Sequence, residues 1–154
     1  MTNADVLGLA DRLGAKRTLS PKESAFVLDA QPDKVTRIQF AWQYECLGVM
    51  LWALGYSAEL GRPDRIVDVR RIVSIMKEKA PIRLREEARL RSISELLDEA
   101  DLIYRYHWAC VDARVNGAPP PRGLDCGVVL ERHRALNWLI GYQGQAWDDV
   151  TTDT

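Results

Sequence analysis

The chain has 154 residues, of which 47% are hydrophobic and 28% charged, and this length and composition predict one soluble globular domain. It has 21 Lys and Arg residues and 22 Asp and Glu residues, which gives a formal net charge of -1. Because contacts of Lys and Arg with phosphates carry most of the affinity of nucleic-acid binders, this balance argues against a nucleic-acid partner.

Targeting and membrane signals are absent from the sequence. The N-terminus, MTNADVLGLADRLGAKR, lacks the apolar core of a signal peptide. The longest strongly apolar stretch, Cys46 to Gly55, is shorter than the ~20 residues that a membrane helix needs. The cysteines are odd in number and far apart, which favours reduced thiols over disulfides at Cys46, Cys110 and Cys126. We therefore expect a cytoplasmic protein with no membrane contact.

Helical signals dominate the first half of the chain. Ser20 to Glu23 reads as a capping box with proline at the first helical position, and this helix should end near Asp29. A longer helix is predicted from Asp33 to Gly55. Asp68 is a candidate cap for a third helix, and the pattern IRLREEARLR after Pro81 is ambiguous.

The second half contains two further helices. Ser92 to Glu95 is another capping box, and the helix that it opens should stop at Asn116-Gly117. The run GAPPPRG must be a surface loop, and a last helix is predicted from about Gly127 to Tyr142. No stretch alternates as a strand would. The predicted class is all-α, a single compact domain of about six helices.

The apolar faces of these helices carry polar residues in their midst. Placed at 100° per residue, the expected apolar positions include Ile38, Trp42 and Trp52 in the Asp33 helix, Leu96, Leu97, Ala100 and Tyr104 in the Ser92 helix, and Val128, Ala135 and Trp138 in the last helix. Glu45, His107, Glu131 and Arg132 fall among them. His133 lies at the edge of its face, and Asn137 points away.

These four residues permit two interpretations. A bare buried carboxylate would cost several kcal/mol, so Glu45 must be paired, hydrogen-bonded or protonated. The cluster is either a catalytic site with candidate residues Glu45, His107 and Glu131, or a buried ionic network that fixes how three helices pack. The second interpretation is favoured, because buried charges must be paired in any protein.

A polar strip runs along the outer side of the helix from Ile93 to Val115. Asp101 and Arg105 are spaced i,i+4 for a salt bridge, and Asp112 continues the strip. Trp108 borders it and is the tryptophan expected to be most exposed.

Motifs of several catalytic and metal-binding classes are missing. The sequence has no CxxC, HExxH, GxSxG, GxxxxGK[ST] or GxGxxG, and no Glu-x-x-His for a di-metal bundle. Cys46 and Cys110 lie in apolar helices, where a thiol is usually inert. We therefore predict no cofactor and no metal site.

The C-terminal sequence WDDVTTDT suggests a strap. Its aspartates spell DDxxxD, which superficially resembles metal motifs of isoprenoid-processing enzymes, but no second metal motif exists. Trp147 is costly to leave in water. We predict that Trp147 is buried and that Asp148, Asp149 or Asp153 bonds to an arginine or a helix N-terminus.

Together these segments resemble a bacterial family known only as a domain of unknown function. The resemblance rests on WQYECLGVMLWALG, SELLDEADLIYRYHWACVDARVNG, GVVLERHRALNWL and WDDVTTDT, and it covers roughly Leu19 to Thr154. It implies a shared fold with a family-like core at 19–154 and a variable N-terminal helix at 1–18. Gly48 departs from the pattern, where the family has a larger residue. The signature positions are Trp42, Glu45, Trp52, Arg105, His107, Trp108, Asp112, Glu131, Arg132, Trp138, Trp147, Asp148, Asp149 and Asp153.

Small size, balanced charge and the missing catalytic motifs favour a protein that acts by binding, most plausibly another protein, in a regulatory, accessory or toxin-neutralising role. The alternatives are a small enzyme that uses the Glu/His/Asp cluster and a carrier with a Trp-lined pocket. The oligomeric state stays open. The candidate binding residues are Arg105, Trp108, Asp112, Arg132, Trp147, Asp148 and Asp149.

Overall fold

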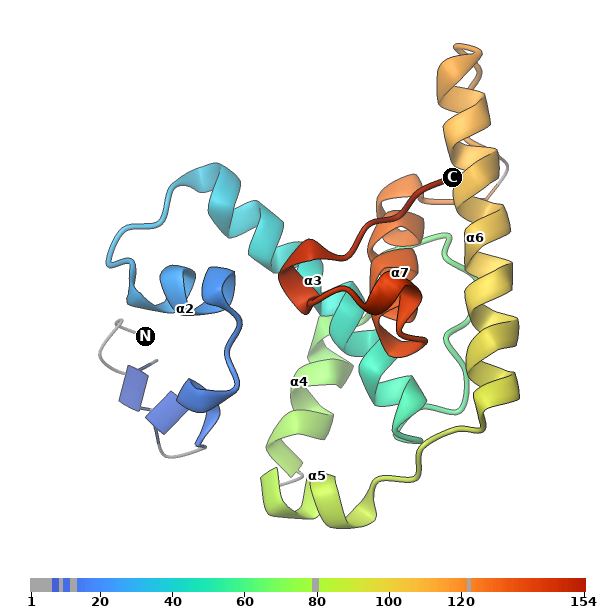
Figure 1. The fold of residues 1–154 in the computed structure, drawn as a ribbon. Helices are drawn as coiled ribbons and strands as arrows, with labels where there is room; N and C mark the ends of the chain where they lie inside the picture. Colours follow the sequence, from blue (N-terminus) through green and yellow to red (C-terminus); the bar gives the residue numbers. More distant parts are fainter. Residues whose placement is uncertain (1–6, 9, 12–13, 79–80, 122) are drawn as a thin grey trace.

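The computed structural model describes residues 7–8, 10–11, 14–78, 81–121 and 123–154 (Figure 1). Within these ranges the regular elements are all helical, which confirms the predicted all-α single domain. None of these helices combines the length and the apolar character that crossing a membrane requires. The elements are η1 (Ala15–Arg17), α2 (Pro21–Leu28), α3 (Lys34–Ala53), α4 (Val69–Glu78), α5 (Pro81–Glu87), α6 (Ile93–Val115), α7 (Cys126–Leu139), η2 (Tyr142–Gly144) and η3 (Trp147–Asp149). The helix expected within residues 1–18 falls largely on positions outside the described ranges.

Side-chain caps fix where two of the helices begin. The Ser20 hydroxyl accepts from the Glu23 backbone N–H at 3.1 Å, while the Glu23 carboxylate accepts from the Ser20 N–H at 2.8 Å. Ser92 and Glu95 form the same reciprocal pair at the start of α6, at 3.2 and 2.9 Å. Each box satisfies two backbone donors that would otherwise lack partners, so both predicted capping boxes are confirmed.

The two weaker helix signals also produce helices. The Asp68 carboxylate accepts from the Arg71 backbone N–H at 3.1 Å, and α4 follows it. The ambiguous segment after Pro81 forms the short helix α5. Local capping chemistry therefore sets the start of α4, as predicted.

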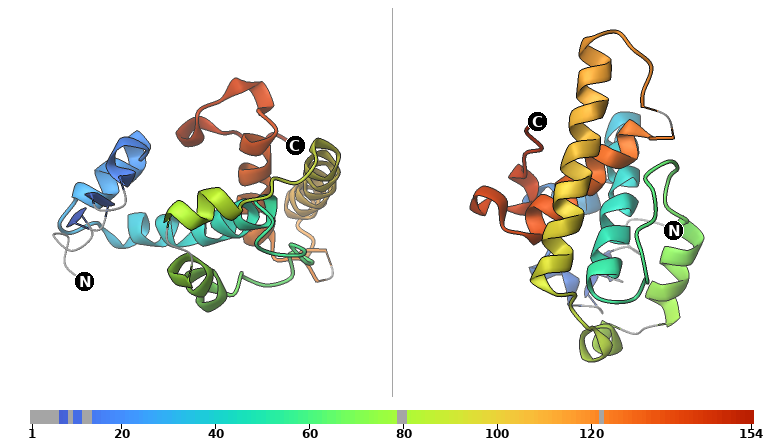
Figure 2. Two further views of the ribbon diagram at one scale, coloured as in Figure 1. Left: turned by 90° about the horizontal axis from the view of Figure 1, so that it is seen from below. Right: turned by 90° about the vertical axis from the view of Figure 1, so that its right-hand side faces the viewer.

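The core forms where α7 packs against both α3 and α6 (Figures 1 and 2). Burying one of its larger aliphatic side chains stabilises the fold by about 1.5–3 kcal/mol. Because α7 has a helix on two sides, it presents two buried faces. The buried core residues are Cys46, Val49, Trp52, Ala53, Leu96, Ala100, Ile103, Cys110, Val129, Ala135 and Leu136.

Only the second half of α3 is buried, which corrects the expectation that Ile38 lies on a covered apolar face. Val49 is fully buried, whereas Ile38 is 49% exposed. The first half of α3 extends past α7, and α2 lies beside it there (Figure 1). The Phe26 ring of α2 stacks on Phe40 with centroids 3.9 Å apart. An apolar pattern predicts a helix but does not tell how much of it the neighbouring helices cover.

The buried faces of α6 and α7 also differ from the predicted ones. Leu97 and Tyr104 of α6 are 49% and 45% exposed, and the buried line is Leu96, Ala100, Ile103, His107, Cys110 and Ala113. Trp138 of α7 was expected in the core and is 43% exposed, whereas Asn137 is buried. The difference arises because the position of the neighbouring helices, and not apolar content alone, decides which face is covered.

Residues 145–154, here called the strap, run back over the body beside α7 (Figures 1 and 2). Trp147 is partly buried, meets Trp138 edge-on at 5.6 Å between centroids and has the Arg134 guanidinium 4.8 Å from its ring. The Asp148 carboxylate accepts from the Lys22 backbone N–H at 2.9 Å, in the first turn of α2. The predicted strap, with a seated tryptophan and an aspartate at a helix N-terminus, is confirmed, although Trp147 is only partly buried.

Cys110 of α6 and Cys126 of α7 form a disulfide, which corrects the prediction of three reduced thiols. Cys46 is a free, buried cysteine. The two bonded residues are 16 apart in sequence, and their Cα atoms lie 5.8 Å apart because the loop after α6 returns the chain to the same end of the helix pair. Spacing in the sequence could not show this proximity.

Replacing both Cys110 and Cys126 by serine should lower the free energy of unfolding by about 3 kcal/mol, because the cross-link restricts the unfolded chain over a loop of this length. Urea unfolding of wild type and the double variant measures the difference. Wild type unfolded with a reductant should lose the same amount. A loss below about 1 kcal/mol would contradict a constraining role for the cross-link.

Candidate functional site

The buried pair Glu45 and Arg132 joins α3 to α7. The Glu45 carboxylate lies 3.4 Å from Nε of Arg132, and the two residues are 3% and 6% exposed. Arg132 Nη1 also donates to the carbonyls of Leu60 and Gly61, at 3.2 and 3.0 Å. The other Glu45 oxygen accepts from the Val67 backbone N–H. Both charges are therefore paired, and both hold the loop that connects α3 to α4.

A cavity of about 430 Å³ lies beside this pair, under the same loop. Gly48 lines it, and a Cβ at this position would lie 3.2 Å from the Val67 side chain. The absence of a side chain at Gly48 therefore lets the loop approach α3 closely. Glu45 and Arg132 reach the cavity, but their hydrogen bonds are directed to the loop and to each other.

His107 of α6 faces His133 of α7 across the helix interface. Their Nδ1 atoms are 2.9 Å apart, and both rings are buried. A hydrogen bond between two ring nitrogens requires one proton between them, so one Nδ1 donates and the other accepts. The pair is therefore compatible with two neutral rings, while a proton on both Nδ1 atoms would place two N–H groups against each other.

The surroundings of the pair disfavour the charged form of both rings. Burial and the nearby His107 lower the pKa of His133 to about 4, against opposing contributions from the Asn137 hydrogen bond and the Asp153 charge. Burial and then the Arg114 charge lower the pKa of His107. Both imidazoles are consequently neutral at pH 7.

Glu131 does not join these pairs. Its carboxylate lies 3.5 Å from the Cys46 thiol and 3.9 Å from Arg134. Burial and then the Glu131 charge raise the pKa of Cys46, so this thiol stays protonated and inert. The expected constellation is thus divided into three separate contacts, Glu45 with Arg132, His107 with His133, and Glu131 with Cys46. Among the described side chains, no three potential metal ligands gather closely enough to hold an ion.

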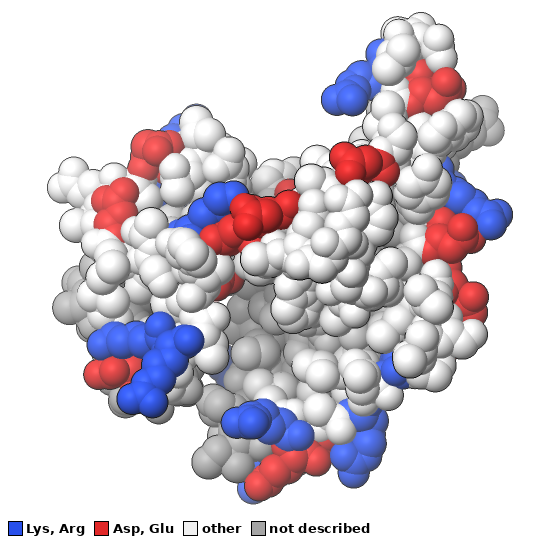
Figure 3. Space-filling view, viewed as in Figure 1, with Lys and Arg blue, Asp and Glu red and all other residues white. Residues whose placement is uncertain are grey.

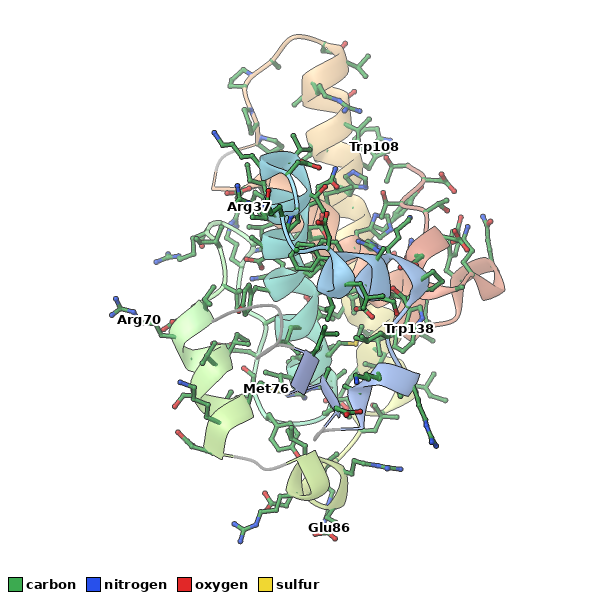
Figure 4. The ribbon with its side chains drawn as sticks, turned by 90° about the vertical axis from the view of Figure 1, so that its left-hand side faces the viewer. Arg37, Arg70, Met76, Glu86, Trp108 and Trp138 are labelled. Carbon is green, nitrogen blue, oxygen red and sulfur yellow. A yellow bond between two sulfur atoms is a disulfide. The ribbon has the colours of Figure 1, made fainter. Side chains whose placement is uncertain are left out.

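The other candidate binding residues lie at two places. On the outer side of α6, Arg105 pairs with Asp101 at 2.7 Å, and the Asp112 carboxylate accepts from Asn116 at 3.0 Å. Trp108 is 55% exposed on the same helix, away from α4 and α5 (Figure 4). Trp147, Asp148 and Asp149 belong to the strap. Among the described residues, no hydrogen bond, ion pair or ring contact joins any of these side chains to His107 or His133.

Sequence patterns did not place His133 and Asn137 correctly. Both are buried, His133 against His107 and Asn137 with its amide donating to the Thr151 carbonyl at 2.9 Å. They lie on a second face of α7 that α6 and the strap cover. The sequence did contain one signal for their burial: His133 and Asn137 are spaced i,i+4 and so share one face of a helix that is rich in apolar residues.

An open groove of about 1010 Å³ lies between α2, α3 and the strap. Its lining is mainly apolar and includes Phe26, Phe40, Tyr44, Leu47, Met50, Trp138 and Trp147. The space-filling view shows acidic and basic side chains adjoining where the strap meets α2, with both signs interspersed over the rest of that face (Figure 3). The groove exists because the first half of α3 extends beyond α7 and because the strap does not fill the space between α2 and α3.

Trp147 brings an unsatisfied donor to this region. Its indole Nε1 is buried and meets no acceptor among the described residues. An unpaired buried donor costs about 1–3 kcal/mol. At the groove wall formed by the strap, a buried indole N–H is therefore left without an acceptor among the described residues.

Glu45→Ala should lower the free energy of unfolding by about 3–5 kcal/mol, because it leaves the Arg132 guanidinium buried without its counter-charge. Asp101→Ala is the matched control, since it breaks the exposed pair with Arg105 and should cost less than about 1 kcal/mol. Chemical denaturation of both variants measures the two losses. Equal losses would show that Glu45 is not a structural counter-charge.

The free energy of unfolding should fall by about 3 kcal/mol as the pH drops from 6.5 to 4, because the unfolded chain takes up a proton at His133 that the folded protein excludes. Above pH 6.5 this contribution is fully present. His133→Gln should flatten the dependence in that window while lowering stability at pH 7. Denaturation curves across the pH range provide the test, and an unchanged slope in the variant would contradict the assignment.

Comparisons with known proteins identify the family of the chain. No curated protein and no solved structure matches it. One family model, described as Domain of unknown function (DUF4272), matches residues 1–150. Its range takes in the first 18 residues as well as the core that the sequence motifs cover. The chain therefore belongs to this family, DUF4272.

Proposed function

We propose that this protein acts by binding a segment of another protein in the groove between α2, α3 and the strap. The observation that carries the proposal is the groove itself, which leaves aromatic and aliphatic side chains facing open space. Trp138 is 43% exposed and Tyr44 is 38% exposed within it. Exposed apolar surfaces of this kind mark interaction sites, because leaving them in water is unfavourable.

The charges around the groove favour a partner segment with a basic residue. Among the lining residues that the structure describes, the carboxylates are Glu23, Asp148 and Asp149, and the one guanidinium is that of Arg37. Asp148 already accepts from Lys22, whereas Asp149 is exposed. An extended or helical segment with an aromatic or long aliphatic anchor and a Lys or Arg fits this chemistry.

The unsatisfied indole of Trp147 supports the same site. A backbone carbonyl from a bound segment could accept from Nε1 after a small rotation of the ring. Partner binding would then supply an acceptor that the described part of the chain does not offer.

The alternative of acid/base catalysis receives less support from the geometry. Glu45, His107 and Glu131 each meet a separate partner and do not converge on one cavity. A proton-transfer site needs its groups within reach of one substrate. Binding without catalysis therefore remains the better proposal.

A peptide selection tests the proposal. Peptides enriched from a random library on the wild-type protein should carry an aromatic or aliphatic anchor near a Lys or Arg. Trp138→Ala and Tyr44→Ala should weaken a selected peptide by about tenfold or more, which corresponds to 1.4 kcal/mol or more of binding free energy.

Trp108→Ala is the control, since it removes an exposed tryptophan of similar exposure from the outer side of α6. It should leave the affinity unchanged. Two results would contradict the proposal: no peptide is enriched, or binding depends on Trp108 and not on the groove residues.

A further inference from the structure

The Cys110–Cys126 disulfide lies in the wall of a second cavity, separate from the groove. This cavity measures about 780 Å³, which is within the range of roughly 300–1,000 Å³ typical of small-molecule sites. Its lining includes both cysteines together with His107, Arg114, Pro120 and Thr152. A disulfide placed this way can be reached by a dissolved molecule without unfolding of the core.

The two sulfurs differ in their surroundings. Cys110 lies in the interior of α6 and is 6% exposed. Cys126 is the first residue of α7, follows the loop after α6 and is only partly buried. Thiol–disulfide exchange requires in-line approach to one sulfur, so access favours attack at Cys126 and departure of Cys110.

The charge at the cavity favours a thiol that carries carboxylates. Arg114 is the charged side chain among the described lining residues, and it is exposed near the end of α6. The Asp125 carboxylate, next to Cys126 in the chain, accepts from the backbone N–H groups of Gly127 and Val128 at 2.9 and 3.1 Å. Its charge is therefore directed into the start of α7, while the guanidinium is available to an anionic ligand.

We propose that Cys110–Cys126 is an exchangeable disulfide, and that a small anionic thiol of about tripeptide size forms a mixed disulfide with Cys126 in this cavity. This modification site is independent of the proposed protein-binding groove. Its effect would be to release the covalent link between α6 and the start of α7 without unfolding the protein.

The exchange balances in two steps. The deprotonated small thiol attacks Sγ of Cys126, the bond to Cys110 breaks, and Cys110 leaves as a thiolate that takes a proton from water. A second small thiol, also deprotonated, then attacks the sulfur that the first small thiol contributed to the mixed disulfide. The bond to Cys126 breaks, and Cys126 is freed as a thiolate that takes a proton. The protein disulfide gains two electrons and two protons, and two small thiols are oxidised to their disulfide.

The test uses glutathione as the probe, with the oxidised form applied to single variants. In Cys110→Ser, which leaves Cys126 free, intact-mass spectrometry should show rapid addition of one glutathione, and peptide mapping should place it on Cys126. In Cys126→Ser, addition at Cys110 should be slower by about tenfold or more. Cys46 is an internal control in both variants and should stay unmodified while the protein is folded.

A measurement on wild type covers the case in which single variants fail to fold. Reduced glutathione should reduce the native disulfide faster than the protein unfolds under the same conditions, and Arg114→Gln should slow this reaction while leaving reduction by an uncharged thiol unchanged. The proposal is overturned if the disulfide is reduced no faster than the protein unfolds. It is also overturned if, in folded variants, glutathione adds to Cys110 as fast as to Cys126.

Discussion

The ion pair between Glu45 and Arg132 determines how the rest of the molecule is arranged. Each side chain is buried, so each needs the other, and the remaining hydrogen bonds of both go to the loop between α3 and α4. While one side of α7 is held against α3, its opposite side packs against α6, where His107 and His133 form a hydrogen bond. The strap packs against the later part of α7, where Arg134 and Asn137 donate hydrogen bonds to carbonyls of the strap. One buried charge pair thus sets the position of a helix to which three other parts of the fold attach.

This arrangement separates structural polar groups from surfaces open to a partner. The Glu45 carboxylate and the imidazoles of His107 and His133 are engaged in contacts between helices. The apolar surface that remains open lies where α3 extends past α7, between α2 and the strap. Because Asp148 joins the strap to α2, the same contact that holds the C-terminal end also shapes one edge of the groove. The contact with α2 would therefore connect stability to the proposed binding of a partner.

The sequence predicted the features that depend on local chemistry. Ser20 with Glu23 and Ser92 with Glu95 set helix starts through neighbours three residues away. The strap was also predicted, although its aspartate contact joins residues 126 apart, and the sequence left open which aspartate and which helix N-terminus would meet. Helical spacing also showed that Glu45, His107 and Arg132 would be buried. When a charged residue lies among apolar residues at helical spacing, the pattern predicts that it is buried. The pattern does not identify its partner.

The features that the sequence did not predict depend on which helices become neighbours. His107 was expected on an apolar face, but helical spacing could not identify His133 as its partner, because that contact exists only after α6 and α7 pack. The same holds for the bond between Cys110 and Cys126. Trp138 looked like a core residue because its face is apolar, yet it lines the groove and is 43% exposed, and its contact with Trp147 of the strap covers only part of the ring.

The most direct test of the proposed peptide binding in the groove is an NMR titration that follows the five tryptophan indole N–H signals during addition of a selected peptide. Trp147 and Trp138 line the groove, and the Trp147 N–H has no acceptor among the described residues, so both signals should shift, with that of Trp147 moving in the direction of a new hydrogen bond. The Trp108 signal should stay in place. A shift of Trp108 with unchanged Trp138 and Trp147 would contradict the account and place binding on the outer side of α6.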